Sequence, residues 1–107
     1  MDRPITALSV PLDSVHLDPE RRTPTPDTPS EDHLLRSSIR KRGMLEPLQV
    51  SDEGAKKDYV IIDGERRFRL AKDGGYDRLI CVVHPYMSAE SRQELRMELK
   101  LTVKAVQ

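Results

Sequence analysis

The chain has 107 residues, enough for one domain with a modest hydrophobic core. Basic and acidic residues number 18 each, and this balance argues against a protein that coats nucleic acid by bulk charge. Aromatic residues make up only 4% of the chain, so a base-stacking platform for single strands is not expected. No apolar run approaches the roughly 20 residues that span a bilayer. The single cysteine, Cys81, excludes an internal disulfide, and we expect a cytoplasmic protein without a membrane partner.

Little regular structure is predicted for the first thirty residues. Residues 1–7 form a loose lead-in. Between Leu8 and Val15 apolar and polar residues partly alternate, and Pro11 limits this segment to a short or edge strand. Four prolines fall within residues 18–30, which predicts an irregular loop long enough to serve a function.

A helix is predicted next. Thr28 can be its N-cap, Pro29 suits the first helical position, and Glu31 completes a capping box. Gly43 ends it. The helix carries an apolar stripe of Leu34, Leu35 and Ile39. Its basic residues favour the helix dipole, which makes a structural role at least as strong an interpretation as ligand contact: Arg36, Arg40, Lys41 and Arg42.

The rest of the chain alternates strands with helices. Residues 45–50 form a turn into a strand, and residues 59–62 form a second strand. The apolar run 79–83 predicts a strand buried on both faces, where Cys81 serves as a small hydrophobe rather than a reactive thiol. Ser88 opens a last helix over residues 88–107. No C-cap follows that helix, which is consistent with a piece of a longer protein that continues into another domain.

The most informative segment is 61–69, Ile-Ile-Asp-Gly-Glu-Arg-Arg-Phe-Arg, at a junction between a strand and a helix. Asp63 is the predicted N-cap, and Gly64 lets another group approach the backbone closely. A helix start offers N–H groups and a partial positive charge, both of which suit a phosphate. Three guanidinium groups can grip phosphate oxygens in pairs: Arg66, Arg67 and Arg69. The segment predicts an anion site, most simply one for nucleotide phosphates.

A structural interpretation of the same residues stays open. Glu65 and Arg69 are four apart with the acid first, the favoured order for an ion pair on an exposed helix.

The sequence offers only weak candidates for a metal site. The three histidines have no ligand-like spacing with Cys81, so a zinc site is not expected. Three acids could gather around a metal-bound nucleotide, although a loop acid is more often solvated: Asp18, Glu20 and Glu65.

Several segments in order resemble the amino-terminal domain of the ParB family, within the wider ParB/sulfiredoxin fold. They are a helix with the pattern Ser-Ile-x-x-x-Gly at 38–43, the stretch 44–50, the segment 59–69, and the Gly-Tyr pair at 75–76 before a strand. The resemblance covers roughly residues 8–100. It implies one α+β domain over residues 1–107, with a small mixed β-sheet packed with about three helices.

The resemblance also implies a ligand and its site. The Gly-Glu-Arg-Arg-x-Arg motif would hold the phosphates of CTP or ATP, with Mg²⁺, in a DNA-associated protein of chromosome or plasmid partition. The nucleotide-binding residues carried over are Gly64, Glu65, Arg66, Arg67 and Arg69, with Arg22, or alternatively Arg21, from the loop before the first helix. The segregation proteins have Glu-Asn-x-Gln-Arg in the last helix, whereas residues 98–102 keep only its acid, Glu98, as a metal candidate. Sulfiredoxins place a reactive Cys where Glu65 and Arg66 stand, so peroxiredoxin repair is not expected.

Two other functions fit this fold. One is a small nucleotide-dependent enzyme, such as a kinase of a small hydroxyl substrate, a nucleoside triphosphatase or a nuclease, with Glu65 and Glu20 as catalytic candidates. The other is an adaptor domain without a ligand, which the incomplete last-helix motif favours and the intact 64–69 segment opposes.

No helix-turn-helix is present, so duplex DNA should bind weakly and without sequence preference. The resemblance allows a homodimer, which could depend on nucleotide.

Overall fold

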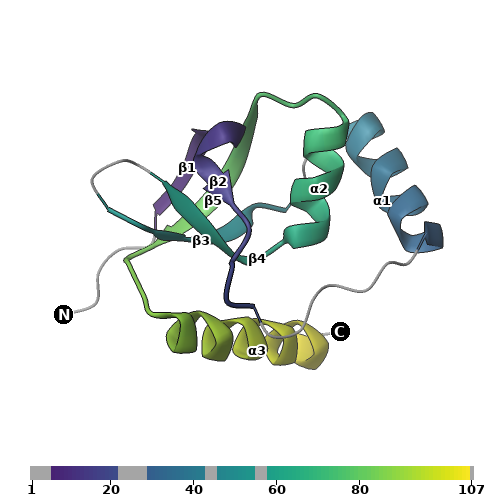
Figure 1. Ribbon diagram of the computed structural model, residues 1–107. Coiled ribbons are helices and arrows are strands. Elements are labelled where there is room, and N and C mark those ends of the chain that lie inside the picture. The colour runs from purple at the N-terminus through teal and green to yellow at the C-terminus, as the bar shows by residue number, and fades with distance from the viewer. Residues whose placement is uncertain (1–5, 22–28, 43–45, 55–57, 107) are drawn as a thin grey trace.

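The computed structural model describes residues 6–21, 29–42, 46–54 and 58–106. Within them the chain forms five strands, three α-helices and one short 3₁₀ turn (Figure 1). The strands are β1 (Thr6–Pro11), β2 (Val15–His16), β3 (Leu48–Asp52), β4 (Tyr59–Asp63) and β5 (Arg78–His84). The 3₁₀ turn is Leu12–Ser14, and the helices are α1 (Pro29–Arg42), α2 (Glu65–Asp73) and α3 (Ala89–Val106).

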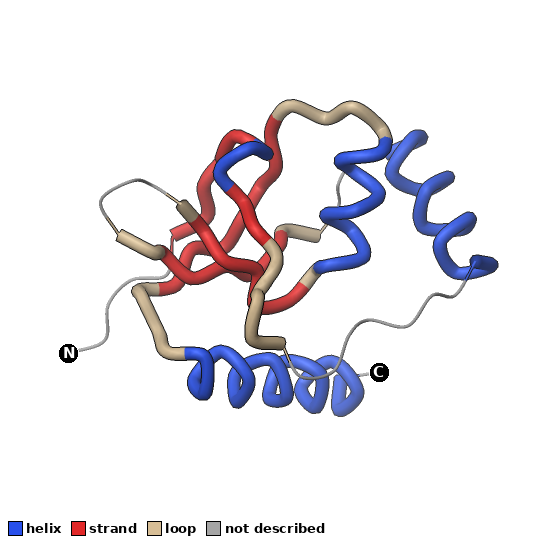
Figure 2. Tube along the Cα trace, viewed as in Figure 1, coloured by secondary structure: helices blue, strands red, loops and turns tan. Residues whose placement is uncertain are grey.

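The five strands form one mixed sheet in the order β1-β5-β3-β4-β2 (Figure 2). β5 pairs antiparallel with β1 and parallel with β3, while β4 pairs antiparallel with β3 and parallel with β2. The predicted α+β class, with a small mixed sheet and three helices, is confirmed. β1 is an edge strand, as the sequence predicts, and an edge position tolerates the missing N–H of Pro11. Its bounds differ from the prediction, because it begins at Thr6, within the expected lead-in, and ends at Pro11.

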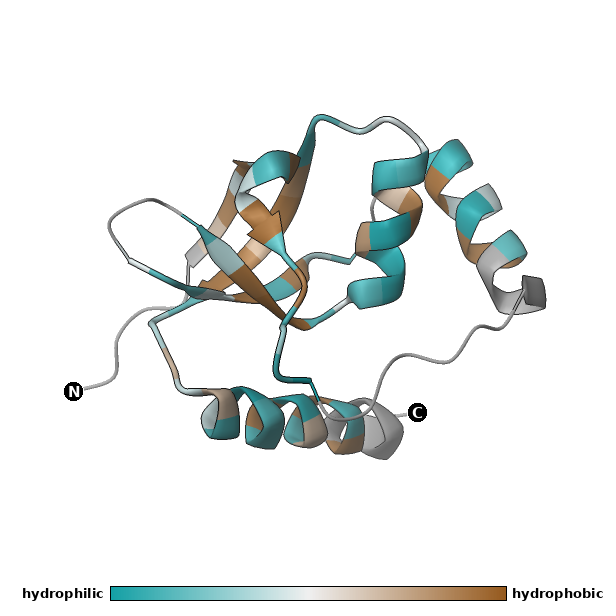
Figure 3. Ribbon diagram, viewed as in Figure 1, coloured by the Kyte–Doolittle hydropathy of each residue, from teal (hydrophilic) through white to brown (hydrophobic). Residues whose placement is uncertain are grey.

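The main core lies between α2 and one face of the sheet. The hydrophobic stretches of these elements are brown in Figure 3. Phe68 and Ala71 of α2 pack against a cluster of buried strand residues. Successive side chains of a strand point to opposite faces, so Val60 and Ile62 face away from that core. Both are nevertheless buried, because α3 packs along β4 on the other face. α1 packs against α2.

The starts of α1 and α3 agree with the sequence. α1 begins at Pro29 as predicted, although the expected caps Thr28 and Gly43 lie outside the described residues. The Ser88 hydroxyl accepts a hydrogen bond from the Ser91 N–H at 3.2 Å and caps α3. Within the described ranges, none of the helices combines the length and apolar character needed to cross a membrane.

The prediction that β5 is buried on both faces is wrong. Leu79 and Cys81 point into the core, but Ile80 between them is 44% exposed and Arg78 is also exposed. Because α3 packs along β4, it leaves this part of the outer face open. Cys81 is wholly buried, and burial raises the pKa of its thiol to about 11, as expected of a structural cysteine.

Candidate phosphate-binding site

The turn between β4 and α2 is built around Gly64. This residue takes the N-cap position with φ +111° and ψ 20°, a left-handed conformation, and makes no side-chain cap hydrogen bond. A Cβ atom at this position would lie 2.9 Å from Cγ of Leu48. Glycine is therefore required both by the backbone and by close packing. The prediction that Asp63 caps α2 is wrong, because the left-handed turn moves the cap one residue along.

The helix that follows presents a short, charged first turn. Phe68 N–H donates to the Gly64 carbonyl at 2.9 Å and closes the first helical hydrogen bond. Phe68 points into the core, while the three arginines of the motif are half-buried around it: Arg66, Arg67 and Arg69. The amino end of α2 adds a partial positive charge to these side chains. The arrangement is suited to an anion with several oxygens.

Two ion pairs tie this turn to neighbouring segments. Arg21, from the loop after β2, donates to Glu65 Oε2 at 2.9 Å, and both side chains are largely buried. Glu65 thus pairs across the fold instead of along the helix with Arg69. Arg67 donates to Glu46 Oε2 at 2.8 Å, but the Glu46 side chain is 74% exposed. An exposed pair contributes little, so Arg67 can exchange this partner for a ligand at small cost.

The other predicted site residues have mixed positions. Arg22 lies outside the described residues, and Arg21 is the loop arginine that reaches the turn. Glu20 and Glu98 are both exposed. In the described part of the chain, no three acid, His or Cys side chains lie close enough together to hold an ion. Asp18 instead binds two arginines.

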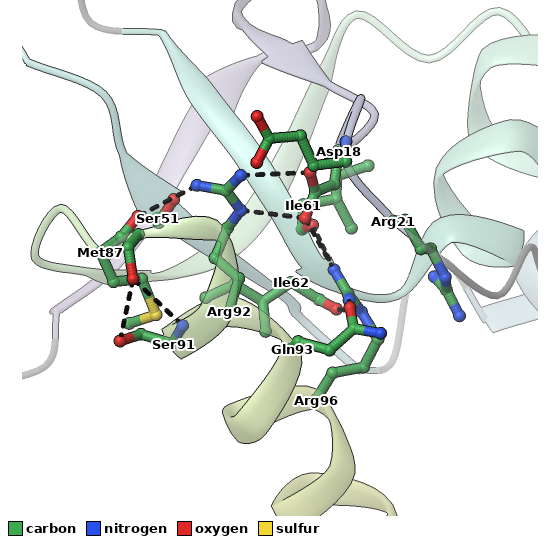
Figure 4. Close-up of polar contacts among 12 residues, drawn as sticks. Asp18, Arg21, Ser51, Ile61, Ile62, Met87, Ser91, Arg92, Gln93 and Arg96 are labelled. Atoms are coloured by element: carbon green, nitrogen blue, oxygen red, sulfur yellow. Dashed lines mark hydrogen bonds and ion pairs between the residues drawn. The ribbon is translucent and has the colours of Figure 1, made fainter.

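That pairing forms a buried cluster between the loop after β2 and α3 (Figure 4). Arg92 donates to Asp18 from Nε at 2.9 Å and from Nη2 at 3.1 Å. Arg96 Nη2 donates to the same carboxylate at 3.1 Å. Burial on its own raises the pKa of Asp18, but hydrogen bonds from Arg92, the Glu20 backbone and Arg96 outweigh it and hold that pKa below its usual range. The carboxylate is therefore charged at neutral pH.

Arg96 also reaches the strand that leads to the turn. Its Nε donates to the Ile62 carbonyl at 2.6 Å and its Nη2 to the Ile61 carbonyl at 3.4 Å. The cluster thus joins three parts: α3, the end of β4 just before Gly64, and the loop that carries Arg21. Sequence reasoning missed it. The available signal was the stripe of α3, where two arginines stand at helical spacing with Leu95 and Leu99.

The comparisons with known proteins place this geometry in a family. A family model described as the ParB N-terminal domain matches residues 6–101. The chain belongs to that family. Relatives of this ParB N-terminal domain include stage 0 sporulation protein J of Bacillus subtilis, 38% identical over 64 residues, or 60% of this chain and 22% of that protein. A probable plasmid-partitioning protein ParB of Xylella fastidiosa is 31% identical over 90 residues, or 82% of this chain and 21% of that protein.

The chain thus spans about a fifth of the length of these relatives.

Solved structures have the same fold. A C-terminally truncated ParB from Caulobacter crescentus, complexed with CTP-γ-S, superposes with a TM-score of 0.77 at 22% identity, covering 91% of this chain and 53% of that chain. Sulfiredoxin from Arabidopsis thaliana superposes with a TM-score of 0.65 at 22% identity, covering 84% of this chain and 97% of that chain. The predicted ParB resemblance and the ParB/sulfiredoxin-like fold are confirmed.

Proposed function

We propose that this ParB N-terminal domain binds the phosphates of a nucleotide at the β4–α2 turn, as a module of a protein of plasmid or chromosome partition. The observation that carries the proposal is the left-handed Gly64 at the start of a helix whose first turns bear three arginines. The amino end of α2 offers backbone N–H groups to phosphate oxygens, and the guanidinium groups neutralise their charge. CTP is the first candidate, because a ParB of the same fold was solved with CTP-γ-S.

Each residue at the turn has a distinct part in this proposal. Arg66, Arg67 and Arg69 contact the phosphates. Glu65 holds Arg21, which brings the loop after β2 to the ligand. The described residues offer no protein-only metal cage, so Mg²⁺ would be bound mainly through the nucleotide's own phosphates. Glu98 on α3 is the carboxylate to test for a metal contact.

Isothermal titration of the chain against CTP, ATP and GTP with Mg²⁺ tests the proposal. The double variant Arg66→Ala with Arg67→Ala removes two charge-assisted contacts and should weaken binding by about 3 kcal/mol, or roughly 150-fold. The matched control is Lys41→Ala with Lys72→Ala, which removes two exposed positive charges away from the turn. Nucleotide binding by the arginine variant at the parent's affinity would place the site elsewhere.

Duplex DNA provides a second measurement on the same charges. The chain alone should bind it weakly and without sequence preference, because backbone contacts carry no sequence information. The affinity for DNA should fall steeply as the salt concentration rises, because binding releases counterions and this release is less favourable at high salt. Added nucleotide should compete for the arginines of α2 and weaken it further. A gel-shift series at two salt concentrations decides this, and tight, sequence-specific binding at physiological salt would contradict it.

A further inference from the structure

A second groove lies at the opposite end of α2 from Gly64. It has a volume of about 490 Å³ and runs between α1 and α2, which lie side by side and in the same direction (Figure 1). Its lining includes Arg36, Ile39 and Arg40 of α1, Leu70 and Asp73 of α2, and Tyr76 beyond α2. This volume falls in the range of ligand-binding clefts. The groove shares no residue with the β4–α2 turn, so the inference stands apart from the proposed nucleotide site.

The floor of the groove is apolar and held in place. Ile39 and Leu70 are each 6% exposed and come from the two helices. The Tyr76 hydroxyl donates to the Ile39 carbonyl at 3.2 Å, which ties the segment after α2 to α1. A ligand would meet a surface that is already formed, and binding then requires little ordering of the protein.

The two walls carry opposite charges that the fold does not use. Arg36 and Arg40 are four residues apart on the α1 wall, while Asp73 stands on the α2 wall. None of the three side chains hydrogen-bonds or ion-pairs with any residue in the described ranges. A polyanion such as duplex DNA would meet the guanidinium groups but would be repelled by Asp73. A ligand with both signs of charge satisfies both walls.

We propose that this groove binds an extended peptide segment of a partner protein, with the pattern acidic-apolar-acidic-basic. In an extended chain, successive side chains point to opposite sides, and neighbours on the same side lie about 6.4–6.8 Å apart. The two acids would then face Arg36 and Arg40, whose Cβ atoms are about 5–6 Å apart on the helix. The apolar and basic residues would face Leu70 and Asp73, which are three apart on α2. One peptide thus matches both walls in register.

The probe is the capped octapeptide Ser-Gly-Glu-Phe-Glu-Lys-Gly-Ser, titrated to millimolar concentration into the ¹⁵N-labelled 107-residue chain and followed by amide chemical shifts. Saturable shifts should be confined to residues 36–40 and 70–76. Arg36→Ala with Arg40→Ala should weaken binding at least tenfold. The control Lys41→Ala with Arg42→Ala removes two exposed charges from the same helix, outside the groove lining, and should leave binding unchanged.

A charge-reversal variant provides a second, independent test of the proposal. The variant Arg36→Glu with Arg40→Glu, once its amide spectrum shows that it is folded, should no longer bind the original peptide. It should instead bind the charge-reversed peptide Ser-Gly-Lys-Phe-Lys-Lys-Gly-Ser. Several results would overturn the proposal: no saturable shift in the groove, equal weakening by the control pair, or groove shifts caused by a short duplex DNA and not by the peptide. Nucleotide binding is followed separately, by the amide shifts of residues 64–69, so that failure of one proposal can be distinguished from failure of the other.

Discussion

Replacing Asp18 with asparagine should destabilise this domain severely. The Asp18 carboxylate is 2% exposed and accepts three hydrogen bonds from Arg92 and Arg96, whose side chains are 7% and 5% exposed. Asp18→Asn preserves the shape but leaves two buried guanidinium groups without a balancing charge. Breaking a buried pair in this way costs about 3–5 kcal/mol, a large share of the ~5–15 kcal/mol that stabilises a typical domain.

Urea denaturation of the variant at neutral pH measures this loss in the free energy of unfolding. The matched control is Asp58→Asn, since Asp58 pairs with His16 on the surface, where the two side chains are 44% and 51% exposed. The control should change the free energy of unfolding by less than about 1 kcal/mol. Equal effects of the two substitutions would refute the reasoning that burial makes Asp18 essential.

The pH dependence provides a second check on the same residue. Because the folded-state pKa of Asp18 is lowered, its contribution is present above the pKa of the unfolded carboxyl and is lost as pH falls through the folded value. The difference between the parent and Asp18→Asn should therefore shrink below about pH 4, near the ordinary pKa of aspartate. A difference that stays constant down to pH 2 would show that the carboxylate charge is not what the cluster needs.

Three further outcomes can be measured. Gly64→Ala should lower the free energy of unfolding by about 1–3 kcal/mol, from the left-handed backbone and the clash with Leu48, and should exceed the effect of Gly54→Ala, where φ is +110° but the space is open. Cys81 should react with a bulky thiol reagent only after unfolding, since burial raises its pKa to about 11; rapid labelling of the native protein would contradict this. Burial lowers the pKa of His84, so stability should fall as pH drops below the unfolded histidine value of about 6.5, and His84→Gln should flatten that fall in a series of melting temperatures.

Signals that act within a few residues were readable from the sequence. Pro29 and Ser88 mark helix starts by their own backbone and hydroxyl chemistry, and the structure has helices beginning at or directly after them. The strand-to-helix junction that contains residues 64–69 was also located correctly. These features depend on local geometry, which a single chain encodes without reference to distant residues.

Features set by distant contacts were not readable. The side chain of Leu48 leaves no room for a Cβ atom at Gly64, the N-cap of α2, and the sequence around residue 64 does not reveal this neighbour. Asp18 and Arg96 are 78 positions apart, so their ion pair emerges only once β4 and α3 are packed. The exposure of Ile80 likewise depends on where α3 lies across the sheet.

The place of β5 between β1 and β3 has a consequence for biosynthesis. Ser9 and Arg78, which hydrogen-bond across the first ladder, are 69 positions apart. At a ribosomal rate of ~5–20 residues per second, β1 waits about 3–14 s for its partner strand, with its backbone edge unpaired. β3 and β4 can form their hairpin during that interval, but only the later arrival of β5 can join the hairpin to β1. The first strand to leave the ribosome therefore pairs only after the last one, β5, has been inserted between β1 and β3.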